Sequence, residues 1–153
     1  MKYIQKSIHR EINIITHLAS CVNSDQLDYR PLKNQRSIKE LLIYLSICGY
    51  FGLQSIIHET RDSEFQKNQE NEFSLDSYGL LQTRQKQKID NWFSRKDLPN
   101  LGKLYWGEEV DLDIAVVEVP LKWLVAYRMN LFLWAKESGA NHLDRTDCWR
   151  KWS

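Results

Sequence analysis

The sequence has no apolar run long enough to cross a membrane. Its 153 residues contain no stretch that approaches the roughly 18 apolar residues of a membrane-spanning helix. The chain begins with a charged amphipathic pattern, from Met1 to Lys6, in place of the apolar segment of a signal peptide. We therefore expect a cytoplasmic protein that has no membrane partner.

The cysteines lack the pattern of a disulfide framework. Cys21, Cys48 and Cys148 are odd in number and form no C-x-x-C motif. Free thiols are typical of proteins in a reducing compartment. This agrees with a cytoplasmic location.

Neither sign of charge is in excess. The chain has 21 basic and 20 acidic residues and a formal net charge of +1. Nucleic-acid-binding domains normally carry a basic patch, so we expect no nucleic-acid partner. Trp149, Arg150, Lys151 and Trp152 combine rings and positive charges that could stack on a single strand. Without a supporting patch, we favour rings that cover the domain or a subunit interface.

Several motifs of known chemistry are also missing. There is no glycine-rich phosphate loop, no G-x-S-x-G and no evident pair of carboxylates for acid–base catalysis. His58 and Glu59 begin a pattern similar to the zinc motif H-E-x-x-H, but its last position is Asp62. His9 and His17 share a helix face yet lie about 12 Å apart along its axis. Spacing alone therefore predicts no metal site among the histidines.

What the sequence does contain is helical periodicity. Through the first part of the chain, apolar residues recur at intervals of three or four, at Ile4, Ile8, Ile12, Ile15, Ala19 and Val22. This stripe predicts a helix that ends near Asn23, where loop-forming residues follow.

The residues of a first turn predict a second helix. Ser37 and Glu40 have the spacing of a capping box, in which each side chain accepts a backbone N–H of the other residue. The apolar residues that follow predict a helix to about Glu59. Gly49 and Gly52 weaken it and indicate either close packing against a neighbour or a bend.

The middle of the chain is less regular. Residues 60–71 are polar and uneven, and we interpret them as a surface loop. A third helix is predicted from Ser74 or Asp76 to about Asp97, with a buried edge formed by Tyr78, Leu81, Ile89 and Trp92. Because residues 83–88 are all polar, this helix should be the most exposed.

The last helix follows a break at residues 98–102 and a short segment, residues 104–110, that predicts a small hairpin or an irregular loop. The helix begins either near Asp113, with a kink at Pro120, or at Pro120 itself. We favour the longer helix because the apolar stripe continues through the proline. Gly139 is a suitable end.

Long helices with irregular connections predict an all-α four-helix bundle. We expect a single domain over residues 1–153, with a tail, residues 141–153, that is packed on the bundle or exposed. The last helix is apolar nearly all round between residues 121 and 135, which predicts a place in the interior or at an interface.

Two segments resemble the DinB/YfiT-like family of four-helix proteins. They are residues 36–45 (RSIKELLIYL) and residues 120–128 (PLKWLVAYR). That family usually has a histidine seven residues after the serine of the first segment, and H-x-x-x-H-R in the last helix. The matching positions here are Tyr44, Trp123 and Tyr127, followed by Arg128. The resemblance implies the family's bundle, with a long crossover connection, and aromatic rings in place of its three ligands.

In typical members three imidazoles bind a divalent metal, and the better-understood relatives are thiol-dependent transferases and isomerases. A phenol coordinates well only after it loses a proton of ordinary pKa near 10, and an indole only donates. We therefore expect a former metal site, without metal or other cofactor, among Tyr44, Cys48, Trp123, Tyr127 and Arg128.

Three interpretations of this site remain open. The rings are core side chains, or they line a metal-free pocket for a small ligand, or a displaced metal site uses His17, His58 or Cys48. Arg128 on an apolar helix needs a carboxylate or carbonyl partner if it is buried, unless it serves to bind a small acid. Cys48 is better explained as a core residue than as a nucleophile.

These patterns favour a non-catalytic or small-ligand-binding bundle, which the resemblance implies to be a homodimer. The alternative is a metal- or thiol-dependent transferase or hydrolase with a displaced site. A third hypothesis is an interaction protein, which would have an exposed apolar patch that includes Trp149 or Trp152.

Overall fold

The first helix, α1 (Lys2–Ser20), follows the predicted apolar stripe. In the computed structural model, which describes residues 1–149, Ile8, Ile12 and Ile15 of this stripe are fully buried. Ile4 is only partly buried against the core. The helix ends just before the predicted position, and a short 3-10 turn, η1 (Ser24–Gln26), follows. This prediction is confirmed.

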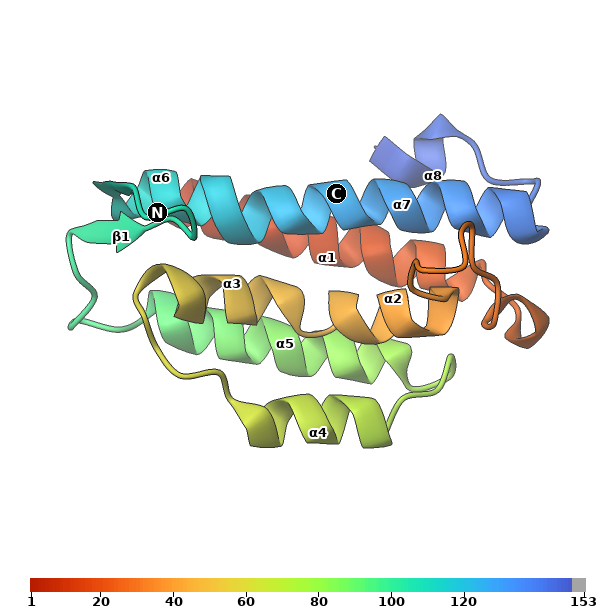
Figure 1. Ribbon diagram of the computed structural model, residues 1–153, viewed down its shortest axis with the longest axis horizontal. Coiled ribbons are helices and arrows are strands. Elements are labelled where there is room, and N and C mark those ends of the chain that lie inside the picture. The colour runs from red at the N-terminus through yellow and green to blue at the C-terminus, as the bar shows by residue number, and fades with distance from the viewer. Residues whose placement is uncertain (150–153) are drawn as a thin grey trace.

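The capping box of the second helix is also confirmed. Ser37 Oγ accepts a hydrogen bond from the Glu40 N–H at 3.2 Å, and Glu40 Oε2 accepts one from the Ser37 N–H at 2.8 Å. The box begins α2 (Ile38–Leu45). The helix does not continue unbroken, however: it is interrupted, and α3 (Cys48–Ile56) continues along the same line (Figure 1).

The prediction of a surface loop over residues 60–71 is wrong. The structure has a helix there, α4 (Ser63–Asn71). Asp62 Oδ1 caps it by accepting a hydrogen bond from the Phe65 N–H at 3.0 Å. Phe65 and Gln69, one turn apart, are both buried. Two inward residues among polar neighbours are too short a stripe to be recognised in the sequence.

The third predicted helix is α5 (Tyr78–Phe93), and its predicted buried edge is confirmed. The expectation that its polar part is exposed is wrong for Gln85, which is 0% exposed. Gln82, one turn earlier on the same helix, is 1% exposed. The physical reason is that both amides find hydrogen-bond partners inside the bundle, so their burial does not leave them unsatisfied.

Those partners are the backbone groups at the interruption between α2 and α3. The carbonyl of Leu45 accepts hydrogen bonds from Gln82 Nε2 at 3.2 Å and from Gln85 Nε2 at 2.9 Å. The carbonyl of Ser46 accepts one from Gln69 Nε2 of α4 at 3.0 Å. A buried carbonyl without a partner would cost about 1–3 kcal/mol of folding free energy, so the glutamines stabilise the interrupted helix.

A small hairpin precedes the last helix, which confirms one of the two predicted alternatives. Strand β1 (Leu101–Lys103) pairs antiparallel with β2 (Glu109–Asp111), with Gly102 opposite Val110. The hairpin leads directly into α6 (Leu112–Val116).

The longer version of the last helix is confirmed. After α6, a π-helical turn, η2 (Val117–Leu121), contains Pro120, and α7 (Lys122–Ser138) continues from it. Proline lacks an N–H group, and a widened turn accommodates it without ending the helix. Gly139, with φ +138°, ends α7 as predicted.

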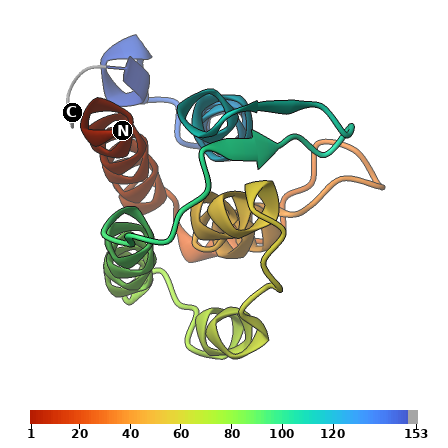
Figure 2. The same ribbon diagram turned by 90° about the vertical axis from the view of Figure 1, so that its left-hand side faces the viewer.

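These elements form an all-α four-helix bundle, as the sequence predicts. The four rods are α1, the α2–α3 pair, α5 and the α6–α7 helix, and Figure 2 shows them nearly end-on. Helices α1 and α3 each pack against both α5 and α7. Helix α4 lies outside the four rods, beside α2–α3 and α5, and the short α8 (Arg145–Trp149) lies on α1 and α7 (Figures 1 and 2).

The last helix is not buried all round, which differs from the expectation. Leu124 and Leu131 are fully buried, whereas Leu133 is 49% exposed. The described part of the tail is packed: Cys148 is fully buried, although Trp149 is 56% exposed. The expectations for Trp152 and its neighbours lie outside the described residues. Within residues 1–149, no helix is long and apolar enough to span a bilayer.

Gly52 allows α3 to approach the π-helical turn closely. A Cβ atom at this position would lie 2.8 Å from both Cα and Cβ of Pro120, closer than real contacts allow. Because one of these atoms belongs to the backbone, the clash cannot be relieved by a side-chain rotation. Close packing was one of the two interpretations of this glycine, and it is confirmed.

We predict that Gly52→Ala lowers the free energy of unfolding by about 1–3 kcal/mol, because overpacking forces α3 away from Pro120. The matched control is Gly79→Ala in α5, where a Cβ meets nothing within 4 Å. That change should be neutral or stabilise by up to about 1 kcal/mol, since alanine favours the helix. Urea denaturation midpoints measure both effects. A midpoint for Gly52→Ala equal to that of Gly79→Ala would contradict the packing argument.

We also predict that Gln85→Leu destabilises the bundle by about 1–3 kcal/mol, because it removes a bond to the Leu45 carbonyl and leaves the buried Gly49 N–H without its 2.9 Å acceptor. Gln87→Leu, at an exposed position of the same helix, is the control. Thermal melting of the two variants gives the comparison. Equal melting temperatures would show that the glutamine contributes nothing to the interruption.

Candidate functional site

Two of the predicted site residues meet between α2 and α7. The rings of Tyr44 and Tyr127 pack edge to face, with centroids 5.0 Å apart and planes at 76°. Both side chains are half-buried against the core. Such a pair contributes roughly 0.5–1.5 kcal/mol beyond the area that it buries.

Cys48 lies at the start of α3, on the other side of the interruption from Tyr44. The prediction that the two share one continuous helix is therefore wrong, although the groups remain close enough to influence each other. Burial raises the pKa of the Cys48 thiol to about 12. The thiol is thus neutral at physiological pH and unsuited to act as a nucleophile or a metal ligand.

The Tyr44 hydroxyl also keeps its proton. Burial is the largest cause that raises its pKa, and Cys48 and Tyr127 add to the increase. Arg36 and Arg61 act in the opposite direction, but burial outweighs them. A protonated phenol donates a hydrogen bond and coordinates a metal poorly.

The remaining ring, Trp123, lies one turn before Tyr127 on α7. Its side chain is half-buried and packs against the core. The indole N–H is a donor without a lone pair to offer. The three aromatic positions together present donors and ring faces.

Arg36 was not identified from the sequence as part of this site. Its guanidinium lies over the Tyr44 ring, 4.2 Å from the centroid, and 5.7 Å from the centroid of Tyr127. Arg61, in the connection between α3 and α4, lies 5.5 Å from the ring centroid of Phe51. Arg36 directly precedes the capping serine of α2, but nothing in its spacing indicates which ring it reaches.

Arg128 is not brought together with the tyrosines. It is 1% exposed and faces α1 and α8, where its Nε lies 2.6 Å from Glu11 Oε2. Its Nη1 donates to the Cys148 carbonyl, and its guanidinium lies 4.4 Å from the Trp149 ring centroid. The predicted need for a carboxylate partner is confirmed. Glu11 is that partner, in place of the bound small acid that was the alternative.

The burial of this ion pair changes the pKa of Glu11. Burial raises its pKa, and the charge and hydrogen bond of Arg128 oppose the increase. The pair joins α1 to α7, and the Cys148 carbonyl adds α8. Arg128 therefore has a structural role in attaching the tail.

The histidines lie at separate places. His9 Nε2 lies 2.8 Å from Asp90 Oδ1, and His17 Nε2 lies 2.8 Å from Asp147 Oδ1. His58 has φ +58° and follows the end of α3, and His142 is exposed. In the part of the chain that the structure describes, no three histidine, cysteine or acidic side chains could hold a metal together.

Two grooves mark the surface around α2. One, of about 310 Å³, runs beside Tyr44 and is lined by Ile43 and Tyr44 of α2, by Ile47 between α2 and α3, and by Gln66 and Glu70 of α4.

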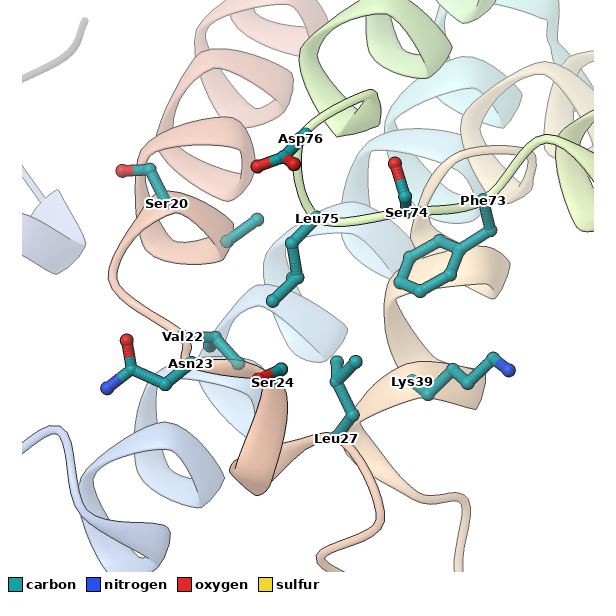
Figure 3. Close-up of a pocket in the computed structure, with 11 residues that line it drawn as sticks. Ser20, Val22, Asn23, Ser24, Leu27, Lys39, Phe73, Ser74, Leu75 and Asp76 are labelled. Carbon is teal, nitrogen blue, oxygen red and sulfur yellow. The ribbon is translucent and has the colours of Figure 1, made fainter.

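The other groove, of about 760 Å³, lies between the end of α1, the start of α2 and the connection before α5 (Figure 3). Leu75 points into it towards Val22 and Leu27, while Lys39 points away (Figure 3). Asp76 also lines this groove, which therefore combines apolar side chains with an acidic one.

We predict that Cys48 resists alkylation in the folded protein, because it is buried and its pKa is raised to about 12. The internal comparison is Cys21, which is partly exposed. Iodoacetamide labelling at pH 8, followed by peptide mass spectrometry, should modify Cys21 first, and both thiols should react in urea. Equal rates for the two thiols in the folded protein would restore Cys48 as a candidate nucleophile.

Comparison with known proteins gives a structural match. No protein-family model matches the sequence, and no curated protein does. The structure is similar to the crystal structure of the DinB-like protein YjoA from Bacillus subtilis, with a TM-score of 0.64 and 18% sequence identity. The similarity covers 90% of this chain and 92% of that chain. The chain therefore has the fold of a DinB-like protein, which confirms the resemblance that its two sequence segments carry.

Proposed function

We propose that this chain is a non-catalytic, metal-independent DinB-like bundle that binds a small molecule at Tyr44, Tyr127 and Trp123. The observation that carries the proposal is the Arg36 guanidinium, which lies 4.2 Å from the Tyr44 ring centroid at the edge of the tyrosine pair. Positive charge and hydrogen-bond donors stand where the resemblance implies that a cation was bound.

The donor chemistry does not fit a divalent metal. A metal site needs lone pairs from deprotonated or neutral ligands. The groups that act on the Tyr44 hydroxyl are instead the Cys48 thiol, the Tyr127 phenol and the guanidiniums of Arg36 and Arg61. The thiol and the Tyr44 phenol keep their protons, and the two guanidiniums repel a cation.

The same set of groups gives little support to catalysis. General acid–base chemistry needs a group whose pKa lies near the working pH. Burial raises the pKa of Cys48 to about 12 and raises that of Tyr44 above its ordinary value. Both changes move the groups away from neutral pH, which favours binding over reaction.

Ligand binding is supported by the surface next to the rings. The groove of about 310 Å³ beside Tyr44 has an apolar floor from Ile43 and Ile47 and polar groups from α4. Small-molecule sites commonly combine apolar walls with a few polar groups. The proposed ligand is therefore small and partly apolar.

The expectation of a homodimer remains a proposal. Leu133 of α7 is 49% exposed, and Phe132 and Trp134 beside it are only partly buried. A second copy would cover this apolar surface. The cytoplasmic location likewise stays an expectation from the sequence.

A metal titration with a histidine-restored variant tests the proposal. We predict that the purified protein takes up no stoichiometric zinc, nickel or manganese and that its melting temperature is unchanged by them. The variant with Tyr44→His, Trp123→His and Tyr127→His should bind one metal ion per chain. At a free metal concentration 100-fold above Kd, binding stabilises by about 2.7 kcal/mol, a rise of roughly 5–10 °C for a chain of this size.

The outcomes separate the hypotheses. Stoichiometric metal in the unmodified protein, with a raised melting temperature, would contradict the proposal and favour the alternative, a metal- or thiol-dependent transferase or hydrolase with a displaced site. His17, His58 and Cys48 would then be the ligands to substitute. Failure of a folded histidine variant to bind metal would show that these three positions do not form the former site.

A further inference from the structure

Arg36, beside the tyrosine pair, and Arg61 lack the carboxylate partners that four other arginines of this protein have. Arg30, Arg84 and Arg128 lie within 2.7 Å of Glu40, Glu72 and Glu11, respectively, and Arg95 pairs with Glu59 and Asp97. Within residues 1–149, neither Arg36 nor Arg61 has such a partner. Both guanidiniums lie over aromatic rings instead.

This arrangement leaves their hydrogen-bond donors available. A guanidinium that contacts a ring with its face keeps its N–H groups directed outward in the plane. The Arg36 Cζ lies 4.2 Å from the Tyr44 ring centroid and 5.7 Å from that of Tyr127, and the Arg61 Cζ lies 5.5 Å from that of Phe51. Planar N–H pairs match the two oxygens of a carboxylate better than any other common side chain does.

Both arginines act electrostatically on the Tyr44 phenol. The charges of Arg36 and Arg61 each lower the pKa of Tyr44 against the larger effect of burial. The two arginines come from different parts of the chain, one before α2 and the other after α3. The sequence gives no sign that both of them act on Tyr44.

The two hydroxyls are donors as well. In the described part of the chain, neither the Tyr44 nor the Tyr127 hydroxyl has a hydrogen-bond partner. Because Tyr44 keeps its proton, its O–H group is available to donate a hydrogen bond to an acceptor. The two phenols and the Arg36 guanidinium beside their rings thus offer donors and positive charge that no acceptor of the described residues satisfies.

We propose that Arg36 and the hydroxyls of Tyr44 and Tyr127 bind the carboxylate of a small aromatic acid. The rings of Tyr44, Tyr127 and Trp123 provide flat apolar surface for the rest of the molecule. Glu40 of α2 and Glu70 of α4 line the groove beside Tyr44, and their negative charges favour a ligand carboxylate beside Arg36 over one inside that groove. This inference rests on the proposed ligand-binding function and names its ligand class.

The test is an NMR titration of the ¹⁵N-labelled protein with benzoate, benzamide and inorganic phosphate. Benzoate should shift amide signals around Tyr44 and Tyr127 and bind at least about 10-fold more tightly than benzamide, which has the same shape without the charge. Phosphate, which lacks the ring, should bind more weakly than benzoate.

Variants locate the binding. Arg36→Gln should weaken benzoate binding about 10-fold or more, and Tyr44→Phe, which preserves the ring pair, should weaken it several-fold. Arg84→Gln is the control, because it removes the same charge from α5. Thermal melting of each variant verifies that it folds.

Each contrary result has a definite meaning. Equal affinity for benzoate and benzamide, or benzoate binding that Arg36→Gln leaves unchanged, overturns the inference. Tighter binding of phosphate than of benzoate overturns the aromatic acid as ligand. Lack of benzoate binding by a protein that also takes up no metal overturns this inference alone, whereas metal uptake overturns the proposed function.

Discussion

The interruption between α2 and α3 is the constraint on which the rest of the structure depends. A helix that stops at Leu45 and restarts at Cys48 leaves buried backbone groups that must find other partners. The Leu45 carbonyl accepts from Gln85 Nε2 at 2.9 Å, and Gln85 Oε1 accepts from the Gly49 N–H at 2.9 Å.

The same interruption attaches the outer helix. Gln69 of α4 donates to the Ser46 carbonyl at 3.0 Å and to the Leu81 carbonyl of α5 at 2.9 Å. One amide thereby joins three elements, although only Phe65 and Gln69 of α4 are buried. A helix with so little apolar surface gains its position from hydrogen bonds that the interruption provides.

The candidate site is arranged by this break. Tyr44 lies one residue before the end of α2 and reaches Tyr127, whereas Cys48 begins α3 and is fully enclosed. The two groups consequently have different accessibility: the phenol ring is open to Arg36, and the thiol is sealed and neutral. A ligand would meet rings and donors while the sulfur remains out of reach.

What could be predicted from the sequence was local in origin. The stripe of α1 and the box of Ser37 and Glu40 depend on residues within a few positions of each other. The features that sequence reasoning missed depend on distant partners. Gln85 is buried only because the Leu45 carbonyl needs it, and Arg36 lies near Tyr127 only because α7 brings that ring beside Tyr44.

The environment of Arg128 could be predicted only in part. Its chemistry required a buried carboxylate partner, which sequence reasoning could state. That the partner is Glu11 of α1 depends on the packing of α1 against α7. The motif that contained Arg128 placed it beside Tyr127, yet adjacent residues on a helix point about 100° apart, so the two face different neighbours.

The fold does not rely on the candidate site for its stability. The close approach of Gly52 to Pro120, the glutamines of α4 and α5, and the Arg128–Glu11 pair all lie outside the tyrosine pair. That pair contributes only roughly 0.5–1.5 kcal/mol beyond its buried area. A bundle held together in this way can exchange ligand-binding side chains without unfolding. The proposed replacement of metal ligands by donors would therefore change what the site binds, from a cation to the proposed anion, while the scaffold stays the same.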